Sequence, residues 1–271
     1  MLNVKLNAAL AQNTSPGAAS RQGKRLNVET AQSTRQGNRN DNQDRASIVV
    51  TDTRILLTVA DGMGGHIGGD VAAEAAIDAL VRCFKRQRGG IRDAGDFLRE
   101  SIAEAHEAVV MLGAALSPEL RPRTTITVCL IADNCATWAH VGDSRIYLLR
   151  DQKVLTRTRD HSAVELLVQQ GLIKDADVHT HPMRNFVEQC LGGEPEMPNM
   201  TIAEPRQLMA GDVLLLCSDG FWAPLDETHV AQELCNRIEL QTMLDVLAAE
   251  AEETASPSSD NVTAVALKWM E

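Results

Sequence analysis

Five short segments place an aspartate beside glycine or small polar residues. They are Arg39–Asp44, Ala60–Gly65, Val141–Arg145, Cys217–Gly220 and Ser259–Thr263. Carboxylates that converge repel one another unless cations lie between them. Ligand sets made only of oxygen suit hard divalent ions such as Mg²⁺ or Mn²⁺, and a pair of such ions is a known device for phosphoryl chemistry with water. The segments therefore indicate metal-assisted hydrolysis of a phosphate ester.

Two of these aspartates follow buried-type strands directly. Asp61 comes after an aliphatic run that ends at Ala60, and Asp219 comes after the run 213–218. Asp-Gly is also a common turn signal, so either pair read alone is an ordinary turn. The glycines after Asp61 let backbone approach a ligand closely, and the repetition at Asp219 favours a site.

Other polar residues are ambiguous by themselves. Asp260 reads as a loop or an Asx turn, and Arg39 reads either as a solvated side chain or as a bidentate phosphate clamp. His66 and the pair His179/His181 lack a third ligand at suitable spacing, which favours surface or packing roles. The sequence contains no Walker-type loop, no Gly-x-Ser-x-Gly elbow and no His-Glu-x-x-His.

Composition narrows the class of partner. The 271 residues contain 26 basic and 37 acidic side chains, a net charge of -11, and only 3% aromatics. An acidic surface with few stacking rings argues against nucleic acid and anionic membranes. No apolar stretch approaches the roughly 20 residues that span a bilayer. The six cysteines form no Cys-x-x-Cys pair, which is typical of buried reduced thiols in a reducing cytosol. We therefore expect a cytoplasmic monomer.

The elements that must position these aspartates can be read from periodicity. Residues 1–25 are polar and aperiodic, which predicts a disordered N-terminal extension before one domain over 26–271. Strands are expected at 27–34, 46–51, 54–60, 124–132, 136–141, 145–150, 153–156, 212–217 and 262–268. Helices are expected at 70–88 with Asp70 as N-cap, and at 96–116, 162–170, 226–237 and 239–254. Closely spaced strands imply antiparallel pairing, so the fold class is α+β with helices covering antiparallel sheets.

Taken together, the segments resemble a known family. Ordered matches include Asn42–Asp44, Thr124–Thr125, Asp160–Ser162, His181–Pro182 and Leu191–Gly192, besides the five aspartate segments. The chain is similar to the bacterial metal-dependent protein Ser/Thr phosphatases, the protein phosphatase 2C family, from about Val28 to Lys268.

The resemblance implies an α-β-β-α sandwich with a dinuclear Mn²⁺ or Mg²⁺ site at one end. By analogy Asp61 bridges both ions, the Gly62 carbonyl binds one of them, and further carboxylates complete the set. Those carboxylates are Asp44, Asp219 and Asp260, with Asp143 and Asp219 sharing a weaker third ion. Arg39 would bind the phosphoryl group, and a metal-bridged hydroxide would attack phosphorus directly. Residues 162–195 correspond to the family's flap.

Three positions depart from the family pattern. Met63 stands where many eukaryotic relatives have a histidine general acid, which leaves the acid unassigned. Gln43 replaces a glutamate, and Arg123 replaces a glycine. For the positive charge around Arg123 a solvated turn is the plainer interpretation and a role in substrate choice the alternative.

The resemblance also implies the substrate: phosphoserine or phosphothreonine proteins, including those of a cognate Ser/Thr kinase. Two alternatives stay open, a pseudophosphatase scaffold and a two-metal hydrolase of nucleotides or small phosphate esters. The intact set of aspartates weighs against a scaffold, and the charge and low aromatic content weigh against nucleic acids.

Overall fold

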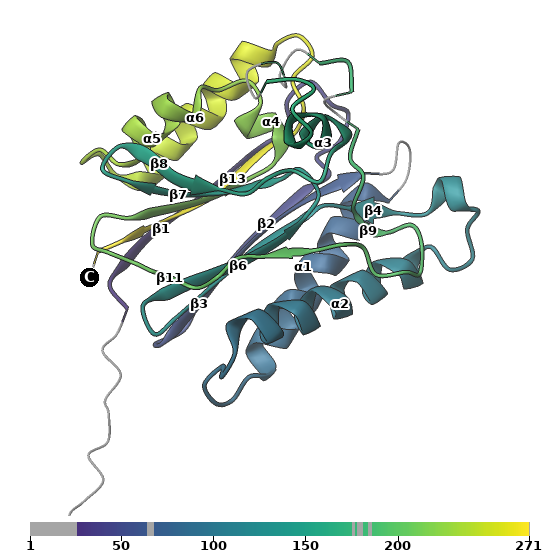
Figure 1. Cartoon of the computed structure of the whole chain (residues 1–271), viewed down its shortest axis with the longest axis horizontal. Coiled ribbons are helices and arrows are strands. Elements are labelled where there is room, and N and C mark those ends of the chain that lie inside the picture. Colours follow the sequence, from purple (N-terminus) through teal and green to yellow (C-terminus); the bar gives the residue numbers. More distant parts are fainter. Residues whose placement is uncertain (1–25, 64–67, 175–176, 178–180, 184–185, 271) are drawn as a thin grey trace, which may run out of the picture.

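The chain folds as two antiparallel β-sheets stacked face to face, with helices on both outer faces (Figure 1). A computed structural model describes residues 26–63, 68–174, 177, 181–183 and 186–270. The predicted extension 1–25 lies outside these residues, as do His66 and His179. The predicted α+β class, an α-β-β-α sandwich, is confirmed.

One sheet has five strands in the order β1-β13-β12-β7-β8. Their bounds are Val28–Arg35 (β1), Arg145–Arg150 (β7), Lys153–Arg157 (β8), Val213–Cys217 (β12) and Val262–Trp269 (β13). β1 and β13 come from opposite ends of the domain and pair over their whole lengths, from Val28 with Trp269 to Arg35 with Val262. This pairing closes the domain.

The second sheet runs in the order β10-β6-β5-β3-β4-β9, with β2 also paired to β3 and β11 to β6. Its main strands are Asp44–Val50 (β2), Arg54–Met63 (β3), Ile126–Ala132 (β5) and Cys135–Val141 (β6). Four two-residue strands extend it: Arg123–Thr124 (β4), Leu191–Gly192 (β9), Thr201–Ile202 (β10) and Arg206–Gln207 (β11). β3 is the central strand of this sheet, and it carries Asp61.

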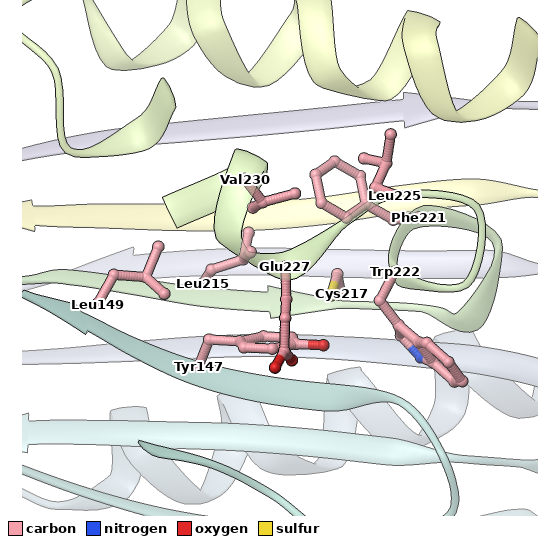
Figure 2. A pocket seen from close by; sticks show the side chains of 9 residues that line it. All are labelled: Tyr147, Leu149, Leu215, Cys217, Phe221, Trp222, Leu225, Glu227 and Val230. Atoms are coloured by element: carbon pink, nitrogen blue, oxygen red, sulfur yellow. The ribbon is translucent and has the colours of Figure 1, made fainter. Parts of the chain in front are cut away.

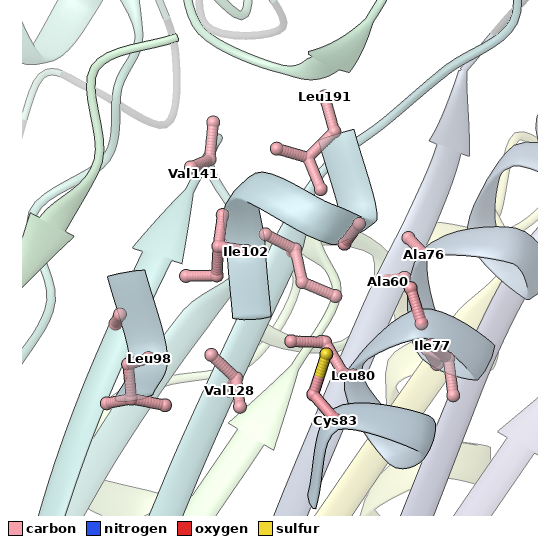
Figure 3. Packing of buried hydrophobic residues seen from close by; sticks show 14 of the residues in the cluster. Ala60, Ala76, Ile77, Leu80, Cys83, Leu98, Ile102, Val128, Val141 and Leu191 are labelled. Carbon is pink, nitrogen blue, oxygen red and sulfur yellow. The ribbon is translucent and has the colours of Figure 1, made fainter. Parts of the chain in front are cut away.

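Helices bury small side chains against the sheets. α1 (Gly69–Arg86) and α2 (Ala94–Leu112) cover the β2–β6 sheet, while α5 (Glu227–Leu234) and α6 (Leu240–Ala255) cover the other sheet (Figure 1). Figure 3 shows Leu80 of α1 and Ile102 of α2 packed over the strand residues Ala60 and Val128. Because four of the nine buried residues of α1 are alanines, the helix lies close to β3 and fixes the strand that carries Asp61.

A third core lies between the two sheets. It contains alternate residues of β3, β5, β7, β12 and β13, such as Leu57, Cys129, Leu148 and Leu216. Each central strand thus buries both faces, which explains its nearly continuous apolar sequence. Two interfaces between sheet and helix and one between the sheets make a rigid support for side chains at the strand ends.

Several predicted boundaries need correction. α1 starts at Gly69 and not at an Asp70 cap. Its N-cap is Gly68, whose positive φ of 108° is a backbone conformation that favours glycine. α2 ends at Leu112, four residues early, where Gly113 follows. Asp219 begins a short helix, α4 (Asp219–Trp222), and does not begin a turn.

Two tight turns join neighbouring antiparallel strands. Asp133 and Asn134 both have positive φ, as do Asp151 and Gln152, the geometry that two-residue hairpins require. Three of the six free cysteines are fully buried and Cys135, Cys190 and Cys235 are only partly so, which corrects the expectation that all six are buried. Within the described ranges, no helix is long and apolar enough to cross a membrane.

The remaining helix bounds are Pro118–Leu120, a single 3-10 turn, and Ala163–Gln169 (α3). Ser162 is the N-cap of α3, and its hydroxyl accepts a hydrogen bond from the Glu165 amide at 3.3 Å. The strand ends that carry the five aspartate segments all lie at the same end of the sandwich, on the side of β4 in Figure 1.

Candidate metal centre

Strand pairing places the first two candidate aspartates next to each other. Asp44 opens β2 directly opposite Asp61 on β3. One residue on, Gly62 lies so close to α1 that a Cβ there would be 2.0 Å from the Gly69 carbonyl oxygen. Only glycine fits this contact, so the backbone at Gly62 is fixed beside the Asp61 carboxylate.

The other sheet supplies the third and fourth candidate aspartates. Asp219 follows β12 and starts α4, and Asp260 stands two residues before β13, the neighbouring strand. Gly220 of α4 packs against the backbone of Asn261, where a Cβ would be 2.1 Å from the carbonyl oxygen. This contact holds the Asp219 and Asp260 segments together.

Asp143 lies in the turn between β6 and β7 and is fixed by Trp222. The indole Nε1 donates a hydrogen bond to the Asp143 carbonyl at 3.0 Å. Trp222 in turn stacks under the Arg145 guanidinium, 3.3 Å from the ring centroid. Arg145 forms a buried two-bond ion pair with Asp160, each N–O distance being 2.8 Å. This stack ties the Asp143 turn to the base of the flap.

The electrostatics show that the five carboxylates share one site. Burial, together with the charges of Asp219 and Asp260, raises the pKa of Asp44 to about 7 against the opposing Ser218 hydrogen bond. Burial and the charge of Asp260 raise the pKa of Asp219 to about 6.

The pKa values of Asp61 and Asp143 are also raised well above the ordinary range. Burial is the main cause for both, and the charge of Asp219 adds to it. Ionising these carboxyl groups, which two sheets bring together, therefore costs free energy, and a bound cation would remove this cost.

The donor set fits hard divalent cations. Asp44 Oδ1 is buried without a hydrogen-bond partner among the described residues, while its Oδ2 accepts a bond from Ser218 at 2.7 Å. Among the described residues, no three His, Cys, Asp or Glu side chains lie close enough together to hold a metal ion by themselves. Mg²⁺ usually keeps several waters and takes only one or two carboxylates from the protein, so the full ligand set stays a prediction.

Arg39 lies at the edge of this cluster. Its Nη2 donates to Asp260 Oδ2 at 2.6 Å while the side chain stays 60% exposed. The Asp260 hydrogen bond and charge raise the pKa of Arg39, and Asp219 and Asp61 contribute in the same direction. The structure thus places all seven predicted site residues at one end of the sandwich.

Sequence reasoning gave no role to two neighbours that shape the site. Ser218 binds Asp44 and also accepts a bond from the Thr263 amide at 3.1 Å. Asn261 accepts from the Gln43 amide at 2.8 Å and donates to the carbonyls of Gln36 and Asp41. Short polar residues flanking Asp219 and Asp260 were the available signal, but only folding shows which distant backbone they bind.

Behind α4 lies a small apolar cavity of about 10 Å³. Figure 2 shows Phe221, Leu225 and Val230 on one side of it and Tyr147 on the other. This volume is hardly enough for a single water, so the cavity is a packing defect and not a substrate pocket.

Metal-free protein is expected to lose stability as the pH rises from about 4 to 7. The pKa of Asp44 is near 3.8 when unfolded and about 7 when folded, so the folded state holds the extra proton and its advantage disappears across this window. We expect a loss on the order of 4 kcal/mol, roughly 10 °C in melting temperature.

Thermal melts in EDTA at pH 5 to 8 measure this slope. Asp44→Asn should flatten it, and exposed Asp52→Asn should leave it unchanged. A metal-free melting temperature that rises over this range, or equal slopes in both variants, would contradict the expected burial of Asp44.

Comparison with known proteins agrees with this geometry. The family profile described as Protein phosphatase 2C matches residues 31–258. The Serine/threonine protein phosphatase PstP of Mycobacterium tuberculosis is 36% identical over 182 residues, which are 66% of this chain and 34% of that protein. The chain therefore spans about a third of this relative.

Shorter relatives match over most of their length. The Serine/threonine phosphatase stp of Listeria monocytogenes is 32% identical over 228 residues, 83% of this chain and 89% of that protein. A crystal structure of the catalytic domain of PstP in complex with two manganese ions superposes with a TM-score of 0.75 and 32% identity, covering 90% of this chain and 99% of that one. The chain belongs to the protein phosphatase 2C family of metal-dependent Ser/Thr protein phosphatases.

Proposed function

We propose that this chain hydrolyses phosphoserine and phosphothreonine in proteins with the help of two Mn²⁺ or Mg²⁺ ions. The observation that carries the proposal is the cluster of Asp44, Asp61, Asp143 and Asp219, whose pKa values are all raised. Asp44 Oδ1 has no protein partner in the described ranges. The manganese complex of the PstP catalytic domain supports the choice of metal.

Each residue has a role that follows from its position. Asp61, opposite Asp44, would bind both ions, and the fixed Gly62 carbonyl would bind one of them. Asp219 and Asp260 would complete the set from the second sheet. When bound, the ions lower the pKa of water and offset charge on the phosphoryl group.

Two further assignments belong to this proposal. Asp143 and Asp219 would share a weaker third ion, since burial and the neighbouring charge of Asp219 both raise the pKa of Asp143. Arg39 would orient the phosphoryl oxygens, exchanging Asp260 for substrate, because a half-exposed guanidinium can form two parallel bonds to phosphate.

The biological setting proposed is that of a cytoplasmic monomer acting on phosphoproteins of a cognate Ser/Thr kinase. Free cysteines support a reducing compartment.

Phosphate release from a phosphothreonine peptide should require Mn²⁺ and stop with EDTA. Without cations the clustered carboxylates repel one another and would also repel the negatively charged phosphoryl group, so release should need the metal. Mn²⁺ titration of metal-free protein, followed by calorimetry and by phosphate release, measures binding and turnover separately.

The outcomes separate the alternatives. Mn²⁺ binding without release from any phosphopeptide would favour a scaffold. Faster release from nucleotides or small phosphate esters than from phosphopeptides would favour the small-ester hydrolase. Release that persists in EDTA would overturn the metal-dependent mechanism.

A further inference from the structure

Arg123 lies at the rim of the candidate metal centre. On β4 it pairs with Met63, one step from the pair formed by Gly62 and Thr124. The Thr124 hydroxyl donates to the Asp61 carbonyl at 2.9 Å. The backbone that carries Arg123 is therefore joined directly to two candidate ligands, which fixes the place of its Cα beside the site.

The side chain of Arg123 is held over a glycine. A Cβ on Gly193 would be 2.3 Å from Arg123 Nε, and Gly193 has a positive φ of 72°. The guanidinium makes one long hydrogen bond, from Nη2 to the Pro118 carbonyl at 3.3 Å. Because residue 193 is a glycine, the Arg123 side chain has room to lie across it.

The charge of Arg123 is not neutralised locally. Across the described part of the chain, it forms no ion pair with a carboxylate. The neighbouring Arg121 differs, because it bonds to the Gly193 carbonyl at 2.9 Å and pairs with Glu194 at 3.2 Å. A guanidinium carries five N–H donors, so Arg123 keeps most of its donors for a ligand.

We propose that Arg123 is a specificity-determining residue that binds an anionic group of the phosphoprotein substrate near the phosphorylated Ser or Thr. The group is a carboxylate or a second phosphoryl group, both of which accept two parallel bonds from a guanidinium. The inference rests on the proposed function. Arg39 is paired with Asp260, whereas, among the described residues, Arg123 has no carboxylate partner that a second anion would have to displace.

The test compares phosphothreonine peptides that differ only in their flanks. One series moves a single aspartate through the positions around the phosphothreonine, a second places a phosphoserine there, and a neutral peptide is the reference. For wild type we expect kcat/KM to favour at least one anionic peptide about 5- to 20-fold at low salt, mainly through KM, and less at high salt. The two series distinguish a carboxylate from a phosphoryl group.

Variants assign the preference to one side chain. Arg123→Gln should remove it, whereas Arg121→Gln, a matched loss of charge at a paired neighbour, should keep it. Arg123→Lys keeps the charge but loses the planar fork, so it should retain only part of the preference. Arg123→Lys also decides the question if Arg123→Gln melts below the assay temperature.

Failure of this inference differs from failure of the proposed function. Equal wild-type rates on neutral and anionic peptides, or a preference unchanged in Arg123→Gln and Arg123→Lys, would overturn the role of Arg123 while phosphatase activity stands. If wild type hydrolyses none of the peptides, the proposed function fails and the role of Arg123 fails with it.

Discussion

Asp61→Asn is expected to lower Mn²⁺-dependent phosphate release by about 10³-fold or more. Loss of a single positioned electrostatic group commonly costs about 10²–10³-fold in kcat, and Asp61 is the carboxylate expected to serve both ions. The variant should remain folded, because an amide of the same shape relieves repulsion among Asp44, Asp219 and their neighbours. Phosphopeptide turnover measures the loss of activity, and calorimetry measures the accompanying loss of Mn²⁺ binding.

Thermal melts make this prediction specific to the metal centre. In EDTA at pH 8, Asp61→Asn should melt at or above wild type, and Mn²⁺ should raise its melting temperature less than that of wild type. Asp52→Asn, in the exposed turn before β3, is the matched control and should behave as wild type. An Asp61→Asn protein with wild-type turnover would remove Asp61 from the proposed ligand set.

Gly62→Ala is expected to be the most damaging single methyl addition near the site. The new Cβ would lie 2.0 Å from the Gly69 carbonyl oxygen and 2.8 Å from that of Gln43, so β3 and α1 must separate. Such overpacking costs about 3 kcal/mol, roughly 10 °C in melting temperature for a chain of this size. The displaced Gly62 carbonyl should also weaken Mn²⁺ binding.

Gly89→Ala provides the comparison, because a Cβ at Gly89 would meet no atom within 4 Å. Its melting temperature and Mn²⁺ affinity should match wild type. A Gly62→Ala protein that keeps both properties would show that α1 can move away from β3 at little cost, contrary to the tight alanine packing of this helix.

Regular periodicity made most of the fold predictable. The alternating and continuous apolar runs correctly indicated β3, β5 and β12, and the small-residue pattern indicated α1. The boundaries failed where tertiary contacts override local signals. Asp70 is a good N-cap by type, yet α1 begins at Gly69 because close contact with Gly62 needs glycine.

The two Asp-Gly pairs show the same limit within the site. By sequence they looked equivalent, but Asp61 and Gly62 remain in β3 while Asp219 and Gly220 open α4. Gly62 packs against the start of α1 and Gly220 packs against Asn261. The same dipeptide therefore adopts two different backbone conformations, and no local sequence pattern distinguishes the two.

The sequence alone determined the residue types, the number of carboxylates and the strand ends that carry them, because these depend on local composition and periodicity. Only the tertiary structure decided that Asp44 faces Asp61, that Ser218 binds Asp44, and that the charge of Arg123 stays unpaired within the described ranges. These facts depend on register between strands far apart in the chain. Register follows from the packing of both sheet faces together, which no single segment encodes.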